Sequence, residues 1–149
     1  MKRCWIAAIL MLAMLTLAGC GTNGIVYEKI VGEYDTISSY YKVTGYTGED
    51  AELTIPAKYQ STPVTFIGKE AFAGNQIITK VILPEGLAEL RDRAFADCPN
   101  LTEVQIPSTI SRMGEDIFAG SDKVTLIVTS GGMAEAYAIE AGISYRVQG

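Results

Sequence analysis

The chain has 149 residues, a length typical of one domain, and 48% of its residues are hydrophobic. Its net charge is −5, it contains no histidine, and its lysines and arginines do not cluster. A nucleic-acid-binding protein is therefore excluded, because contact with phosphates needs grouped basic side chains.

The N-terminus has the pattern of an export signal. Lys2 and Arg3 precede an uncharged run that extends from Cys4 to Cys20. A basic start followed by an apolar run is typical of a secretory signal peptide. The run is also about long enough for a short membrane span, which needs roughly 17–25 residues. The residues that end the run favour a signal peptide over a membrane span.

These residues are Leu17-Ala18-Gly19-Cys20, and they resemble the lipobox of bacterial lipoproteins. The resemblance implies that a diacylglycerol is attached to the sulfur of Cys20 and that residues 1–19 are removed as a signal peptide. Two acyl chains hold a protein stably to a bilayer, since each buried CH₂ contributes about 0.8 kcal/mol. We therefore expect an exported protein that is lipid-anchored at the cell membrane or cell surface. An ordinary signal peptide and an uncleaved anchor helix are the alternatives.

The segment after the anchor is expected to be irregular at first and then extended. Residues 20–39 carry few structural signals and are predicted to be a tether. Residues 40–46 and 51–56 have the composition of two strands, with a turn at 47–50 between them. Together with a surface loop at 57–65 they form a predicted N-terminal strand pair, 40–66.

A 23-residue repeat fills the next part of the chain. Phe72, Phe95 and Phe118 follow one another at this period. Three more apolar columns have the same spacing: Ile67, Leu90 and Met113; Ile78, Leu101 and Val124; Val81, Val104 and Ile127. The period falls in the range of leucine-rich repeats, whose units bury their apolar sides only by stacking. The predicted repeats are 67–89, 90–112 and 113–130.

The second repeat contains Ala94-Phe95 and, further on, Ile106-Pro107. This pattern resembles the BspA-type leucine-rich repeat family, and the resemblance covers residues 40–149. It implies a leucine-rich repeat solenoid, α+β or mostly β, with short parallel strands on one face and short helical or 3₁₀ turns on the other. The three phenylalanines and Cys98 are expected in its core. The third repeat lacks the Ala and Pro of the motif, which indicates a degenerate last coil.

The C-terminal residues 131–149 are predicted to cap the solenoid. Gly131-Gly132 breaks the repeat, residues 133–141 are rich in strong helix formers, and Gly142 stands where a helix often ends. Residues 143–147 then alternate as a strand does. A cap is needed because the end of a solenoid otherwise exposes its apolar interior.

Outward-facing strand residues are the candidate binding residues. Aligning the strands at the repeat period places eight side chains on a concave face: Glu52, Thr54, Lys80, Ile82, Glu103, Gln105, Leu126 and Val128. Mixed charged and exposed apolar residues suit protein recognition, although β-branched residues are also simply good strand formers. The face is smaller than the roughly 800 Å² per partner of a standard interface. We therefore expect weak binding by one copy, reinforced by avidity when many copies share a membrane.

No pattern in the sequence predicts catalysis. The chain has no Cys-x-x-Cys, no Gly-x-Ser-x-Gly and no phosphate loop. The acidic pairs Glu49-Asp50 and Glu115-Asp116 are interpreted as turn and solvated residues rather than as catalytic carboxylates or a calcium site. No enzyme activity, metal or cofactor is expected.

The leading hypothesis is a membrane-anchored surface lipoprotein that presents a leucine-rich-repeat surface for protein binding or adhesion. The family resemblance implies this class, because such repeats are associated with attachment to host proteins and other cells. The alternative is a structural or accessory scaffold lipoprotein of the cell envelope. The expected partners are the membrane, through the lipid on Cys20, and an unidentified protein of a host or of the envelope, and no nucleic acid.

Overall fold

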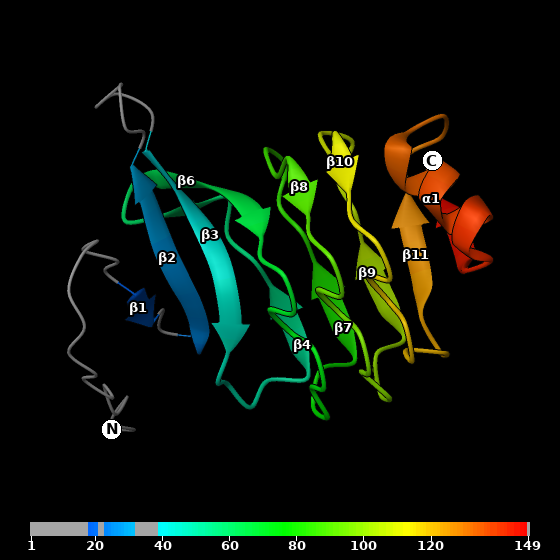
Figure 1. Cartoon of the computed structure of the whole chain (residues 1–149), viewed down its shortest axis with the longest axis horizontal. Helices are drawn as coiled ribbons and strands as arrows, with labels where there is room; N and C mark the ends of the chain where they lie inside the picture. The colour runs from blue at the N-terminus through cyan, green and yellow to red at the C-terminus, as the bar shows by residue number, and fades with distance from the viewer. Residues whose placement is uncertain (1–17, 21–22, 32–38, 149) are drawn as a thin grey trace.

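A computed structural model describes residues 18–20, 23–31 and 39–148. The predicted signal peptide up to Leu17 lies outside these residues, as do the tether segments 21–22 and 32–38. None of the described helices is long and apolar enough to cross a membrane. The described chain winds into an elongated solenoid with a β-strand region at one end and a helix at the other (Figure 1).

One face of the solenoid is a parallel sheet of five strands in the order β12-β11-β9-β7-β4. Its strands are β4 (Glu52–Thr54), β7 (Lys80–Ile82), β9 (Glu103–Gln105), β11 (Thr125–Val128) and β12 (Ser144–Val147). Each repeat contributes one strand, and Leu53, Val81, Val104 and Leu126 of the first four strands are buried in the core. The predicted stack of short parallel strands is confirmed.

A second sheet covers the opposite side. Its order is β1-β2-β3-β6-β8-β10, with β5 attached to β6. The strands are β1 (Ala18–Cys20), β2 (Ile25–Val31), β3 (Ser39–Tyr46), β5 (Lys58–Tyr59), β6 (Thr62–Ile67), β8 (Glu89–Leu90) and β10 (Arg112–Met113). In each repeat one of these short strands leads into a hydrogen-bonded turn that carries the phenylalanine. The fold class is confirmed as a leucine-rich repeat solenoid built mostly of strands.

The N-terminal region is more ordered than the sequence predicts. Residues 25–31 of the predicted tether form β2, which pairs antiparallel with β3 along its whole length. Ile25 and Tyr27 are buried, and the Tyr27 ring stacks on Tyr59 with centroids 4.2 Å apart. The tether prediction is therefore wrong for these residues, because their side chains close the N-terminal end of the core.

Two further predictions in this region are wrong. Residues 57–65 are not a loop, since β5 and β6 form a hairpin whose turn residues Gln60 and Ser61 both have positive φ, 48° and 67°. The predicted strand pair 40–66 is not a pair either. Residues 40–46 and 51–56 do form strands, but β3 joins β2 and β6 whereas β4 joins β7 in the other sheet.

The core is organised by the three repeated phenylalanines. Phe72 stacks on Phe95 with centroids 4.9 Å apart and planes 5° apart, and Phe95 stacks on Phe118 at 5.7 Å and 8°. All three are buried, as predicted. Tyr137 of the C-terminal helix meets the last ring of this stack edge-on, 6.3 Å from Phe118. One ring from each coil thus forms a continuous column through the interior.

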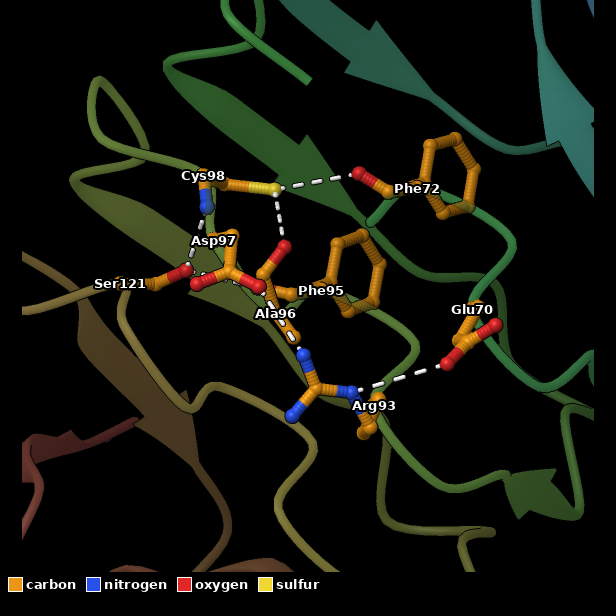
Figure 2. Close-up of polar contacts among 8 residues, drawn as sticks. All are labelled: Glu70, Phe72, Arg93, Phe95, Ala96, Asp97, Cys98 and Ser121. Atoms are coloured by element: carbon orange, nitrogen blue, oxygen red, sulfur yellow. Dashed lines mark hydrogen bonds and ion pairs between the residues drawn. The ribbon is translucent and has the colours of Figure 1, made fainter. Parts of the chain in front are cut away.

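A polar column accompanies the aromatic one (Figure 2). The Cys98 thiol donates to the Phe72 carbonyl oxygen at 3.2 Å, and one coil further on the Ser121 hydroxyl donates to that of Phe95 at 2.7 Å. Ser121 also accepts from the Cys98 N–H at 2.9 Å. Burial raises the pKa of the Cys98 thiol, which keeps it protonated as a donor. Cys98 is the buried structural residue that the sequence predicts.

Each turn has two left-handed positions. Glu70, Arg93 and Asp116 occupy the first, with φ of 55°, 53° and 51°, and the second accommodates glycine. Gly74, Asp97 and Gly120 occupy equivalent places in successive repeats and have φ of 72°, 55° and 74°. A side chain added at Gly74 would meet no atom, whereas one added at Gly120 would overlap Oδ1 of Asp97. Gly120 is thus constrained by its backbone and by its neighbour, and Gly74 by its backbone alone.

We expect Gly74→Ala to lower the free energy of unfolding by about 1–2 kcal/mol, the cost of a left-handed L-residue. Gly120→Ala should cost more, because Asp97 must move away and its ion pair with Arg93, at 2.9 Å, is lost. Urea unfolding of both variants measures the difference. In an Asp97→Gly background the two costs should become equal; a difference that persists would contradict the steric explanation.

The predicted C-terminal cap is present. Helix α1 (Met133–Ala141) ends at Gly142 in the left-handed conformation, with φ of 66°, and β12 follows. Ala134 and Ala138 are buried against the last coil. The Tyr137 hydroxyl accepts a hydrogen bond from the Ile117 N–H at 3.0 Å. The helix therefore covers the end of the core in place of a further coil.

Candidate binding face

The outward side chains of the five-stranded sheet form two rows, because its strands are parallel and in register. The first row is Glu52, Lys80, Glu103, Thr125 and Ser144, and the second is Thr54, Ile82, Gln105, Ile127 and Arg146. All ten side chains are exposed or half-exposed. We call these two rows the binding face. It contains six of the eight predicted residues.

The other two predicted residues, Leu126 and Val128, do not belong to this face. Both have 0% exposure and lie in the core. Thr125 pairs with Glu103, one position short of the full repeat period, so the third repeat has lost one residue before its strand. Because side chains alternate along a strand, a shift of one residue exchanges the two faces. Thr125 and Ile127 occupy the places predicted for Leu126 and Val128.

A carboxylate between two cations lies at the centre of the binding face. Oε1 of Glu103 is 2.8 Å from Nζ of Lys80, and Oε2 is 2.8 Å from a guanidinium nitrogen of Arg146. The hydrogen bond from Lys80 lowers the pKa of Glu103, and that bond also raises the pKa of Lys80. Glu103 and Lys80 are therefore both charged at neutral pH. The sequence prediction missed Arg146, since β12 lies outside the repeat.

The second row adds an apolar element. Ile82 and Ile127 are half-exposed on either side of Gln105 in the register of the sheet. Half-exposed isoleucines beside a side-chain amide offer both apolar contact and hydrogen bonding. The charged centre and this row together place ionic, apolar and hydrogen-bonding side chains on one face.

The acidic pair Glu115-Asp116 has a structural role in its turn. The Glu115 N–H donates to a carboxylate oxygen of Asp92 at 3.1 Å, and Asp116 has a left-handed φ of 51°. Over the described part of the chain, no group of three or more His, Cys, Asp or Glu side chains is placed to hold a metal ion.

The stacked coils and their mixed strand surface define a repeat scaffold of the leucine-rich-repeat class. The chain belongs to the BspA-type leucine-rich repeat family, whose model matches residues 51–138. No curated protein shows significant similarity to it.

Two solved structures share the fold. One is a leucine-rich repeat protein from Bacteroides capillosus, which is 24% identical with a TM-score of 0.61 over 74% of this chain and 81% of that one. The other is a leucine-rich cell surface protein from Faecalibacterium prausnitzii, also 24% identical, with a TM-score of 0.60 over 76% of this chain. The match spans 30% of the latter protein, whose chain is much longer.

Proposed function

We propose that the chain is a lipid-anchored surface protein whose binding face attaches to another protein, without catalysis. The observation that carries the proposal is the row of half-exposed isoleucines around Gln105, next to the charged centre at Glu103. The lipobox motif ending at Cys20 supports the anchor. Membership of a repeat-scaffold family and the fold of a cell surface protein from F. prausnitzii support the placement and role.

The charges on the face bear on the kind of partner. Glu103 is already neutralised by Lys80 and Arg146, so the centre of the face presents a closed ion-pair network. A strongly charged ligand would have to break these pairs. Affinity is therefore expected to come mainly from apolar contact with Ile82 and Ile127, and the charges are expected to set register and specificity.

Binding is tested with the soluble chain, lacking the signal peptide, displayed at high density on beads. Host matrix proteins and an extract of the producing cell's own envelope are offered separately. We expect the double variant Ile82→Ser/Ile127→Ser to lose at least about 10-fold in captured partner, because apolar contact is removed from the middle of the face. Ile139→Ser is the matched control, since Ile139 is 63% exposed on α1, away from the face.

The two arms distinguish adhesion from a scaffold role in the envelope. Face-dependent capture of a host protein supports adhesion, and face-dependent capture of an envelope protein supports the scaffold alternative. If the double variant is folded by circular dichroism and captures as much partner as the unchanged chain, the binding face does not bind the partner and the proposal is wrong on this point. If avidity contributes, the amount of captured partner should fall steeply when fewer copies of the chain are attached to each bead.

A further inference from the structure

The turns of successive coils are joined by a ladder of backbone hydrogen bonds. Three alternate amides of the first turn donate to carbonyl oxygens of the second at 2.8–3.1 Å: Glu70 to Asp92, Phe72 to Ala94, and Gly74 to Ala96. Three amides of the second turn donate to the third at 2.7–3.0 Å in the same way: Arg93 to Glu115, Phe95 to Ile117, and Asp97 to Ala119. Donors thus face the C-terminal end of the solenoid in both turns.

The third turn has no fourth turn to receive its donors. The corresponding amides belong to Asp116, Phe118 and Gly120, each one repeat period after a donor of the second turn. Among the described residues, none of the three donates to an acceptor. Helix α1 covers the ring of Phe118 through Tyr137 but contributes no strand or turn to this ladder. The ladder therefore ends in a row of unpaired donors.

The three residues that carry these amides line a groove. A hollow of about 350 Å³ lies between the last turn and the chain that follows α1. Asp116, Phe118 and Gly120 line one wall, and Tyr137, Gly142 and Ile143 line the other. The groove is large enough for a few residues of extended chain, and alternate amides match alternate carbonyls of such a chain.

The charge of the groove restricts its ligand. Asp116 and Asp122 line the groove itself, and Glu115 and Glu140 line an adjoining hollow of about 410 Å³. An anion such as phosphate would be repelled by these carboxylates in spite of the free amides. A peptide carbonyl is a neutral acceptor, and basic side chains beside it would pair with the carboxylates.

We propose that this end groove binds an extended, basic peptide segment of a partner protein. Its carbonyl oxygens accept hydrogen bonds from the amides of Asp116, Phe118 and Gly120, as a fourth turn would. A second copy of this chain is a poorer occupant, since its net charge is −5. At the other end of its ladder, Gly45 of β3 lies close to the Ala71 carbonyl and the Tyr46 ring packs against Phe72.

The probe for the test is the blocked peptide acetyl-Lys-Val-Lys-Val-Lys-amide, titrated into the ¹⁵N-labelled soluble chain and followed by NMR. We expect the amide signals of Asp116, Phe118 and Gly120 to shift with a Kd between about 0.1 and 3 mM, in the weak range expected of so small a contact. Spermine, which has similar charge but no carbonyl, should leave these three signals in place.

Matched variants separate the contributions. Asp116→Asn and Asp122→Asn should each weaken peptide binding about threefold or more, while Glu85→Gln, an exposed carboxylate elsewhere, should not change it. Ile82→Ser/Ile127→Ser should also leave peptide binding unchanged. The proposals for the end groove and for the binding face are therefore tested separately.

Several results would overturn the proposal. They are shifts caused equally by spermine or by acetyl-Glu-Val-Glu-Val-Glu-amide, absence of shifts at peptide concentrations well above the expected Kd, and shifts confined to the binding face. Shifts of the three amides that appear on raising protein concentration without peptide would assign the groove to a second copy instead.

Discussion

Replacing Phe95 with alanine is expected to lower the free energy of unfolding by about 3–5 kcal/mol, the usual cost of truncating a buried aromatic side chain. Phe95 is fully buried at the centre of the aromatic column, with Phe72 on one side and Phe118 on the other. Both stacking contacts are lost together, and the cavity opens in the middle coil.

The repeat architecture increases the consequence of this cavity. Each coil contacts only its neighbours, so stability is approximately a sum of coil terms and interfaces between adjacent coils. Damage to the middle coil weakens two interfaces, whereas damage to a terminal coil weakens one. A small solenoid has little stability in reserve, so we expect Phe95→Ala to unfold near room temperature or to unfold in two steps.

Equilibrium urea unfolding followed by circular dichroism measures the change. Phe66→Ala is the matched control, because Phe66 is half-exposed on the second sheet, beside Tyr40 and under the Arg91 guanidinium at 5.4 Å. Its loss should cost less than half as much. Equal costs for the two variants would mean that the column of rings does not hold the coils together.

The phenylalanine column shows what the sequence can predict. A residue that recurs at a fixed period and is apolar in every copy must occupy the same place in every coil, so its burial follows without coordinates. Cys98 follows the same period, and its counterpart Ser121 makes the equivalent hydrogen bond one coil later. Periodicity therefore determined the fold class, the core and most of the binding face.

The errors arose where periodicity stops. Ile25 and Tyr27 precede the repeat, and Tyr27 packs on Tyr59, which no spacing connects to it. Leu126 was predicted to face outward where Ile127 does, because one residue is missing before this strand of the third repeat. The run is almost wholly apolar, so either register buries apolar side chains and the sequence does not distinguish them. Arg146 reaches Glu103 from a strand that belongs to the cap and is distant in sequence.

Replacing Cys20 with serine is expected to move the protein from the membrane fraction to the soluble one. A hydroxyl cannot form the thioether, so the variant carries no diacylglycerol. The protein then loses the membrane-binding free energy of two acyl chains, which is about 0.8 kcal/mol for each buried CH₂. Mass spectrometry of the detergent phase should also find the lipid on a Cys20 peptide, and protein in the aqueous phase should lack it.

Cys98→Ser is the matched control for this experiment. Cys98 is buried and serves as a hydrogen-bond donor that serine replaces one coil later, so this variant should remain in the membrane fraction. If the Cys20 peptide of the unchanged protein carried no lipid, the lipobox interpretation would be wrong. If Cys20→Ser stayed membrane-bound after a high-salt wash, the uncleaved apolar run that begins at Cys4 would be its anchor.

The position of Cys20 gives the result a geometric meaning. Ala18 and Gly19 of β1 would be removed with the signal peptide, so β2 (Ile25–Val31), the next strand after Cys20, would form the edge of the second sheet farthest from α1 (Figure 1). If a lipid holds Cys20 at the bilayer, the proposed end groove beside α1 would lie at the far end of the solenoid from that anchor, where the proposed peptide could reach it.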